Sequence, residues 1–333
     1  MAATAAWKPW APACRPFGGL LPVRAGHRSG LLPAPRLLPG PCRSPVGAAA
    51  RSGLLPGPGA AAGPGLWPVA ARCRRGPAAG PGPLSVVDVT IGDMIQVCLN
   101  GRRGADASAA VPLSPEALAR SAAEAVAAGA TDIHVHPRTP CGQDTLSPRV
   151  VAATLTAIRA AVRVPVGVTT GAWAEPDPRR RVERVREWTV LPDHASVNWH
   201  EPGAEELAAA LLERGVAVEA GLWSGTEGHR LFRRSPLAPR VLRVLAEVTD
   251  TDPATATGSA RLLLAEVGAS HGRPVLLHGE EGGAWPVAAL AFRLGLGVRI
   301  GAEDVTVLPD GRPARSNAEL VAAAARLREE AAL

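Results

Sequence analysis

The first 87 residues of this 333-residue chain contain no acidic side chain. Residues 1–86 instead hold 16 prolines, 14 glycines and ten basic residues. Proline and glycine make up about a third of this segment, and aperiodic contents above roughly 25–30% indicate low complexity. We therefore predict that residues 1–90 form a disordered extension without a packed core. Residues 91–333 are predicted to form one globular domain.

Three interpretations of the extension stay open. Abundant arginine without acidic residues is typical of an organelle transit peptide, but such peptides are serine-rich and amphipathic, whereas prolines interrupt this one throughout. A basic arm for an acidic partner is the second interpretation. The third, which we favour, is disorder without function that arises from translation upstream of the true start, because a strand begins directly at Met94.

Three further absences exclude classes of protein. The chain carries a formal charge of +6, but the ten charges of the extension account for it, so the predicted domain has no basic excess for nucleic acid. The domain holds only Cys98 and Cys141, without CxxC spacing, which argues against a disulfide framework and agrees with a reducing cytoplasm. No run approaches the roughly 18 apolar residues of a membrane span. We expect a cytoplasmic protein that binds neither nucleic acid nor membranes.

After Met94, short β-rich runs alternate with segments of helical periodicity. The predicted strands are Met94–Leu99, Asp132–His136, Val164–Val168, Ala195–Trp199, Val216–Gly221, Val241–Val248, Pro274–His278 and Val298–Gly301. The predicted helices are Pro115–Ala128, Pro148–Val162, Arg179–Trp188, Ala204–Arg214, His229–Ala238, Thr255–His271, Trp285–Leu294 and Asn317–Glu329, the fifth having the weakest pattern. Ser114 and Ser147 precede prolines at helix starts, and Gly129 and Gly215 follow helix ends, as capping residues do.

Eight strand–helix units in about 240 residues match the size and rhythm of a (β/α)8 TIM barrel. A doubly wound sheet is the alternative, but it often carries a glycine-rich phosphate loop after its first strand. Here that loop is Leu99–Gly104, which lacks the GxGxxG spacing. The barrel is therefore the favoured fold.

His134 and His136 end the second predicted strand. Residues two apart on a strand point to the same face, so both imidazoles can project into the barrel at metal-ligand spacing. Neutral imidazole suits zinc, although histidines in such a pair are often packed or hydrogen-bonded instead. Glu303 follows the eighth strand, and strands two and eight both border strand one, so its carboxylate can supply a third ligand; alternatively it is a solvated loop charge. Two histidines and a carboxylate leave one zinc position open for a substrate.

Chemistry in such barrels lies at the carboxyl ends of the strands. Hydroxyl and amide side chains at these ends suit the carboxylate or carbonyl of a small substrate, and Arg299 can bind an anion or influence Asp304. The candidates for substrate contact are Thr169, Thr170, Ser196, Asn198, Arg103 and Glu219, with Asn100, Trp223, His278 and Glu280 at further strand ends.

From Met94 to Leu327 the chain resembles the β-keto acid cleavage enzymes, whose characterised type is 3-keto-5-aminohexanoate cleavage enzyme. Three segments carry the resemblance. Ala128–Arg138 is similar to the family's AGA…HxHxR motif, and Val168–Gly171 is similar to its STG turn. Val298–Asp304, followed by Ser316–Val321, is similar to the RxGxED…SNAxLV ending, the most specific of the three.

The resemblance implies roles for individual residues. It assigns the zinc ligands to His134, His136 and Glu303, and the Arg–Asp pair that assists deprotonation to Arg299 and Asp304. It assigns substrate-holding groups to Thr169, Ser196 and Asn198. The implied reaction is a retro-Claisen acyl transfer between a β-keto acid and acetyl-CoA, which yields acetoacetate and a new acyl-CoA. Family members form tetramers, so the resemblance also implies a homo-oligomer.

Two positions depart from the family pattern. The family's amine-binding glutamate corresponds to Arg103, whose guanidinium would repel an ammonium group. We therefore expect a β-keto acid with a neutral or anionic distal end, such as 3-oxoadipate, rather than 3-keto-5-aminohexanoate. The second departure is Pro137, which we expect to redirect Arg138.

Two other function classes stay open. A barrel metal hydrolase also uses an HxH pair, but there the pair belongs on the first strand, with further histidines on strands five and six. An inactive barrel that only binds a ligand is the other class. The presence of both histidines with Arg299, Glu303 and Asp304 argues against a decayed site.

Overall fold

A computed structural model describes residues 91–104, 107–108 and 110–332, so the extension predicted for residues 1–90 lies outside the described residues. Eight parallel strands form a closed barrel in chain order, β1 to β8. The strands are β1 (Ile95–Cys98), β2 (Asp132–Val135), β3 (Val166–Thr169), β4 (His194–Asn198), β5 (Ala217–Trp223), β6 (Arg243–Val248), β7 (Val275–Gly279) and β8 (Gly297–Ile300). Ile95 pairs with Val298 where β1 meets β8, which closes the barrel.

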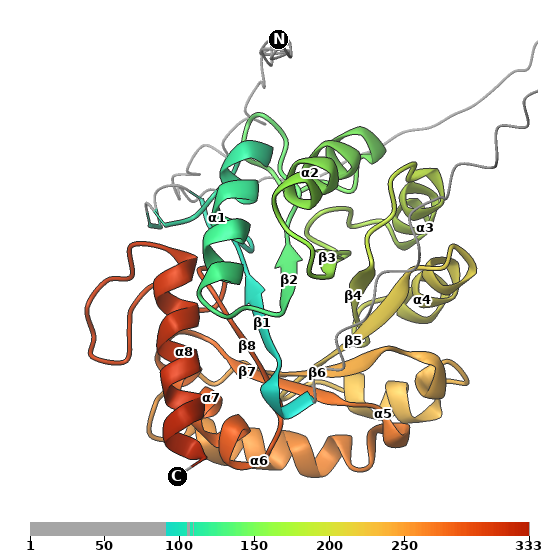
Figure 1. Cartoon of the computed structure of the whole chain (residues 1–333). Coiled ribbons are helices and arrows are strands. Elements are labelled where there is room, and N and C mark those ends of the chain that lie inside the picture. Colours follow the sequence, from blue (N-terminus) through green and yellow to red (C-terminus); the bar gives the residue numbers. More distant parts are fainter. Residues whose placement is uncertain (1–90, 105–106, 109, 333) are drawn as a thin grey trace, which may run out of the picture. The chain divides into compact units, whose positions relative to one another are not determined.

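A helix follows every strand, and the helices surround the barrel in Figure 1. They are α1 (Pro115–Ala127), α2 (Pro148–Ala161), α3 (Pro178–Glu187), α4 (Ala204–Glu213), α5 (Gly228–Arg234), α6 (Ala256–Val267), α7 (Ala284–Arg293) and α8 (Asn317–Ala331). The last helix packs beside the first, so the helical ring also closes. The described residues therefore form the predicted (β/α)8 barrel.

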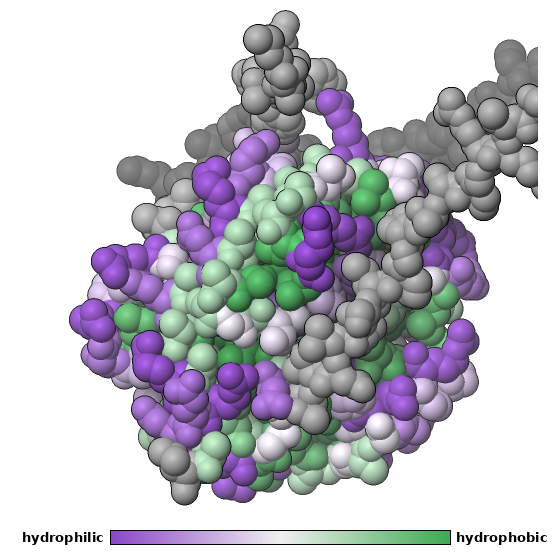
Figure 2. All heavy atoms as spheres, in the orientation of Figure 1, coloured by the Kyte–Doolittle hydropathy of each residue, from purple (hydrophilic) through white to green (hydrophobic). Residues whose placement is uncertain are grey.

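The apolar core lies between the strands and the helices. Strand residues such as Val97, Ile133 and Val166 are fully buried and pack with helix residues such as Leu118 and Leu155. Parallel strands covered on both faces bury most of their side chains, which accounts for their nearly continuous apolar runs. On the face seen in Figure 2, hydrophilic side chains lie mainly toward the edge of the view and apolar ones toward its middle. Within the described part of the chain, no helix is long and apolar enough to cross a bilayer.

All eight predicted strand–helix units are present, with two helices shorter than expected. The fifth helix ends at Arg234 because Ser235 precedes Pro236, and a residue before proline avoids the helical region. The sixth ends at Val267 because Gly268 turns the chain with a φ of +60°. Of the predicted caps, Ser114 accepts a hydrogen bond from the Ala117 N–H (3.2 Å), whereas the Ser147 side chain makes no capping bond.

A buried polar layer fills the barrel near the amino ends of its strands. Asp132, His194 and Arg243 are the first residues of β2, β4 and β6, and side chains from alternate strands share a layer in such barrels. The Arg243 guanidinium lies 3.0 Å from the Asp132 carboxylate and 2.5 Å from that of Glu219. Burial opposes ionisation of Asp132, but Arg243 outweighs it and holds the pKa of this carboxyl below its usual range. This ion cluster belongs to the core and leaves the opposite end of the barrel for chemistry.

Candidate functional site

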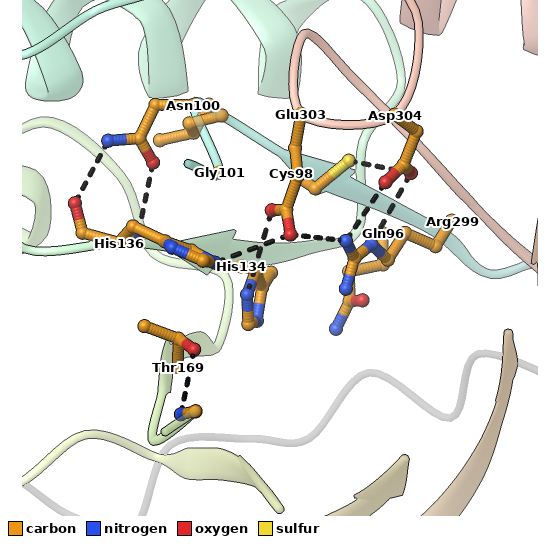
Figure 3. A network of polar contacts seen from close by, with 12 residues as sticks. Gln96, Cys98, Asn100, Gly101, His134, His136, Thr169, Arg299, Glu303 and Asp304 are labelled. Carbon is orange, nitrogen blue, oxygen red and sulfur yellow. Dashed lines mark hydrogen bonds and ion pairs between the residues drawn. The ribbon is translucent and has the colours of Figure 1, made fainter. Parts of the chain in front are cut away.

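His134, His136 and Glu303 meet at the carboxyl end of the barrel. The ligand atoms of the three residues all lie within 4.8 Å of one another. His136 Nε2 is 3.3 Å from Glu303 Oε1, and His134 Nε2 is 3.7 Å from Glu303 Oε2 (Figure 3). Four ligands placed tetrahedrally around zinc, each at about 2 Å, lie about 3.4 Å apart. The three side chains are therefore spaced as a metal ion requires and could hold one.

Buried polar atoms without hydrogen-bond partners support this fit. Among the described residues, His136 Nε2 and Glu303 Oε2 have no hydrogen-bond partner. His136 Nδ1 lies 3.0 Å from Asp144 Oδ1, so a proton on Nδ1 leaves the Nε2 lone pair directed at Glu303. Metal-binding histidines usually donate their second ring N–H to a carboxylate in this way.

The charges around the two imidazoles also favour a cation. Burial lowers the pKa of His134 to about 3, so this ring stays neutral and keeps a lone pair for a metal. Burial would also lower the pKa of His136, but the carboxylates of Glu303 and Asp144 outweigh it and raise that pKa. The site therefore attracts a positive charge, either a proton or a metal ion.

Neighbouring residues fix the positions of the ligands. The Asn100 side chain accepts the His136 N–H and donates to the His136 carbonyl, both at 2.9 Å, so it holds the backbone of this ligand (Figure 3). Asn317, from the SNAxLV-like segment, accepts the Ala302 N–H at 2.8 Å and donates to the Leu99 carbonyl at 2.8 Å. It thereby ties the residue before Glu303 to the end of β1.

Gly101 leaves room for the Glu303 side chain. Its φ is +56°, and a Cβ atom at this position would overlap the Cγ, Cβ and Cδ atoms of Glu303. A positive φ and close approach both favour glycine. The loop after β1 therefore has to carry glycine here for Glu303 to reach the histidines.

Arg299 joins the two carboxylates that follow β8. One of its terminal nitrogens lies 2.6 Å from Glu303 Oε1 and 2.9 Å from Asp304 Oδ1. Burial alone would raise the pKa of Glu303, but Arg299 and the histidines hold it well below its usual range. Burial likewise opposes ionisation of Asp304, yet Arg299 and His278 lower its pKa to about 2. Both carboxylates are therefore ionised at neutral pH.

His278 and Cys98 lie behind Asp304. The Cys98 thiol donates to Asp304 Oδ2 at 2.9 Å, and burial raises the pKa of the thiol, so it stays protonated. His278 Nδ1 is 3.4 Å from Asp304 Oδ2, and its Nε2 is 3.4 Å from Glu247 Oε2. Burial would lower the pKa of His278, but Asp304 outweighs it, and the pKa rises to about 10. Cationic His278 and Arg299 therefore flank the anionic Asp304.

A cavity of about 360 Å³ opens over these groups. Its walls come from the segments after β1, β3, β7 and β8 and from strand residues such as His134, Ser196 and Arg299. The lining residues are Arg102, Arg103, His134, His136, Thr169, Trp173, Ser196, Asn198, Trp223, Glu247, Glu280, Arg299, Glu303 and Asp304. The cavity is of the size that small-molecule sites have.

Three of the predicted substrate-contacting residues with hydroxyl or amide groups lie on this wall: Thr169, Ser196 and Asn198. Thr169 Oγ1 accepts the Gly171 N–H at 3.2 Å, so its own proton is available to a substrate oxygen. Asn198 donates to Glu201 Oε1 at 2.9 Å, which sets the direction of its amide.

Thr170 and Glu219 are not brought to the cavity wall. The Thr170 hydroxyl donates to the Ser196 carbonyl at 2.6 Å, within the barrel wall. Glu219 is fully buried and belongs to the ion cluster of Arg243 at the amino end. Glu219 lies four residues before Trp223, the last residue of β5, and it is Trp223 that lines the cavity.

Arg103 lines the cavity, but its charge is shared. Its Nε donates to the Glu303 carbonyl at 2.9 Å, and a terminal nitrogen lies 2.5 Å from Glu281 Oε1. Arg138, the arginine after Pro137, does not line the cavity: it donates to the Gly142 carbonyl at 2.6 Å and to the Gly101 carbonyl. Arg138 thus joins the loops after β1 and β2.

Four residues at or beside the site were not singled out from the sequence: Asp144, Glu247, Arg102 and Trp173. Asp144 lies in the loop after β2, eight residues beyond His136, and no local pattern marks it. Glu247 had a usable signal, because it is an acidic residue near the carboxyl end of a strand that is apolar between Arg243 and Glu247. Trp173 follows the threonine–glycine turn after β3, and no sequence pattern marks this loop residue as part of the cavity wall.

The comparisons with known proteins agree with this architecture. Three solved structures of ObcA are similar: an apo form (17% identity, TM-score 0.53), a ternary complex with a C4-CoA adduct and oxalate (16%, 0.53) and a binary complex with oxaloacetate (16%, 0.52). They match 67%, 68% and 67% of this chain, and the chain spans 62%, 68% and 64% of their lengths. At this identity the likeness shows the fold alone. No curated protein matches the chain.

The family profile of the beta-keto acid cleavage enzymes matches residues 94–333. The match covers the whole barrel, including β2 with its histidines and β8 with the carboxylates that follow it. The resemblance noted in the sequence therefore extends over most of the chain, and this protein belongs to the beta-keto acid cleavage enzyme family.

Proposed function

We propose that this protein is a zinc-dependent acyltransferase that cleaves a β-keto acid with acetyl-CoA as co-substrate. The acyl group that contains the keto carbon passes to CoA. The remaining two-carbon fragment, the carboxylate and the carbon next to it, joins the acetyl group as acetoacetate. The observation that carries the proposal is the convergence of His134, His136 and Glu303 beside the buried Arg299–Asp304 pair in one cavity.

The ligand set suits this chemistry. Two imidazoles and one carboxylate would hold zinc and leave a coordination position open, as in catalytic zinc sites. When bound, the ion supplies a Lewis acid that polarises the keto oxygen and acidifies the carbon between the keto and carboxylate groups. Thr169, Ser196 and Asn198 supply hydrogen-bonding groups on the same wall to hold the substrate oxygens.

Asp304 is the proposed proton acceptor. Its carboxylate lines the cavity and is ionised, because Arg299 and His278 stabilise the charged form despite burial. A carboxylate with so low a pKa is a weak base. An anionic substrate beside Arg299 would offset the charge of the guanidinium and raise the pKa of Asp304. Substrate binding would therefore strengthen the base that acts on it.

Arg103 bears on the choice of β-keto acid. It brings a guanidinium to the position of the amine-binding glutamate, so an ammonium-bearing substrate loses its carboxylate partner there. The ion pair between Arg103 and Glu281 weakens the repulsion between the guanidinium and an ammonium group. It does not replace the missing carboxylate at this position. We propose a substrate with a neutral or anionic distal end, 3-oxoadipate being one candidate.

The remaining features of the proposal follow from the family and the composition. We propose a homo-oligomer, with the tetramer implied by the resemblance, that acts in the cytoplasm on small molecules and not on nucleic acid or membranes. We also propose that the catalytic unit comprises residues 91–333 and that the segment before it takes no part in catalysis.

Metal analysis combined with an acetoacetate assay tests the function. The full-length protein is expected to bind about one zinc per chain and to form acetoacetate only when a β-keto acid and acetyl-CoA are both present. Glu303→Gln is expected to lose zinc and turnover, whereas Asp304→Asn is expected to keep zinc and lose turnover. Product formation without acetyl-CoA would indicate a hydrolase, and zinc binding without turnover of any β-keto acid would indicate a binding protein.

A further inference from the structure

Aromatic side chains form a continuous row along one side of the cavity. Starting at His136, the Trp173 ring stacks nearly parallel to the imidazole, with centroids 5.9 Å apart and planes 2° apart. Trp223 follows at 6.4 Å from Trp173, and His200 at 4.8 Å from Trp223. Trp173 and Trp223 both line the cavity. We call these two indoles the tryptophan wall. It begins beside a proposed metal ligand and leads away from it.

Apart from Arg102, whose guanidinium lies over the Trp173 ring, the charged groups of the cavity lie away from the tryptophan wall. The lining residues contributed by β3, β4, β5 and the loop after β3 are all uncharged: Thr169, Trp173, Ser196, Asn198 and Trp223. The charged lining residues beyond the histidine pair come from β1, β6, β7 and β8 and the segments after them: Arg102, Arg103, Glu247, Glu280, Arg299, Glu303 and Asp304. The reacting head of a substrate belongs on the charged side, beside Arg299 and the proposed metal ligands. Its distal part then has the uncharged side available.

The surroundings of the wall distinguish between possible distal groups. A carboxylate placed against the Trp223 indole would lose its hydration, which is unfavourable, because the positive group beside the wall, Arg102, lies over the Trp173 ring instead. An ammonium group could bind an indole face through cation–π attraction. However, the Arg102 guanidinium already lies 5.6 Å from the Trp173 ring centroid, and Arg103 lines the same cavity, so a second cation would be repelled. An uncharged apolar group gains from contact with both rings.

We propose that Trp173 and Trp223 determine specificity and select β-keto acids whose distal group is uncharged and apolar, either alkyl or aryl. This proposal rests on the proposed function and narrows its substrate class, since it favours a neutral distal end over an anionic one.

The test compares substrates that share one reacting head. The kcat/KM of the zinc-loaded full-length enzyme is measured with 3-oxohexanoate, 3-oxo-3-phenylpropanoate, 3-oxoadipate and 3-keto-5-aminohexanoate at saturating acetyl-CoA. We expect the two apolar substrates to exceed both charged ones by at least about tenfold, because a single methylene in an apolar pocket already changes kcat/KM by about 10-fold or more. A preference for either charged substrate overturns the proposal.

Variants identify the residues responsible. Trp223→Ala is expected to lower kcat/KM for the apolar substrates about tenfold or more, mainly through KM, and to leave the values for the charged ones nearly unchanged. Trp223→Phe keeps a smaller ring and is expected to fall in between, so it serves if the alanine variant does not fold. Trp285→Phe is the matched control, because the Trp285 indole donates to the Val307 carbonyl at 2.9 Å and does not line the cavity. An equal loss for every substrate, with a raised KM for acetyl-CoA, would assign the wall to CoA and overturn the proposal.

Binding separates the two proposals. Quenching of tryptophan fluorescence by each β-keto acid, without acetyl-CoA, reports on the wall even if no substrate turns over. If no β-keto acid turns over but only the apolar acids quench the fluorescence, the proposed function is refuted and the role of the wall is not. Turnover without any preference among the four acids would refute only the role of the wall.

Discussion

Asp144 contacts the proposed metal ligand His136, and its replacement tests whether the site is built for a metal. Asp144 Oδ1 lies 3.0 Å from His136 Nδ1, and both side chains are largely buried. Replacing Asp144 with asparagine keeps an acceptor oxygen but removes the charge that strengthens the imidazole as a ligand. Loss of such a supporting carboxylate typically weakens metal affinity about 10–100-fold. That range corresponds to about 1.4–2.7 kcal/mol at 25 °C.

Competition titration against a chelating zinc indicator measures this change. Because the pKa of His136 is raised, protons compete with zinc for this ring at acidic pH. Removing Asp144 lowers that pKa and so weakens the competition. At acidic pH this partly offsets the loss of zinc affinity. We therefore expect the full loss at pH 8 and a smaller one at pH 6. Asp310→Asn is the matched control, because Asp310 is an exposed partner of Arg312. Unchanged zinc affinity in Asp144→Asn at pH 8, with a marked loss in His136→Ala, would refute the supporting role of Asp144.

Three further predictions concern residues that support the site or the barrel. Gly101→Ala is expected to lower both the zinc content and Tm, because the added Cβ would overlap Glu303 and the backbone φ at this position is +56°. Zinc analysis and thermal unfolding measure the two effects, and an unchanged metal content would contradict the prediction. Asn317→Ala removes hydrogen bonds to Ala302 and Leu99 from a fully buried site, and urea unfolding is expected to show a loss of about 1–3 kcal/mol or more. The pKa of Asp132 lies below its ordinary value of 3.8, so its stabilising contribution is complete above about pH 4 and is lost as the pH falls further. Asp132→Asn should therefore flatten the acid limb of the stability curve, and an unaltered limb would show that other groups control it.

The alternation of apolar runs and helical segments was sufficient to predict the barrel. The predicted strand ends differ from those in the structure by two residues at most, as with Thr169, which the structure includes in β3. The proximity of His134, His136 and Glu303 followed from barrel geometry once the strands were numbered, because β2 and β8 both border β1.

The residues that sequence reasoning missed depend on loop conformation. Asp144 reaches His136 only because the loop after β2 folds back, as the bridge between Arg138 and Asp144 shows. Trp173 reaches the cavity because the chain turns after β3, and no periodic pattern specifies that turn. Thr170 and Glu219 miss the cavity for different reasons. Thr170 follows the lining residue Thr169, and consecutive residues of an extended chain point to opposite faces. Glu219 lies too far from the carboxyl end of β5, four residues before Trp223.

The metal ligands lie on either side of β1, where the last strand meets the first, and this has a consequence for how the protein is made. During synthesis His134 and His136 leave the ribosome long before Glu303, and the pairing of β8 with β1 cannot form until both strands are available. A nascent chain therefore presents two histidines without their carboxylate, which is a weak and unselective metal site. High affinity would arise only when the barrel closes, so zinc loading would report the completion of folding. A metal captured then would link the end of the second strand to the segment after the eighth.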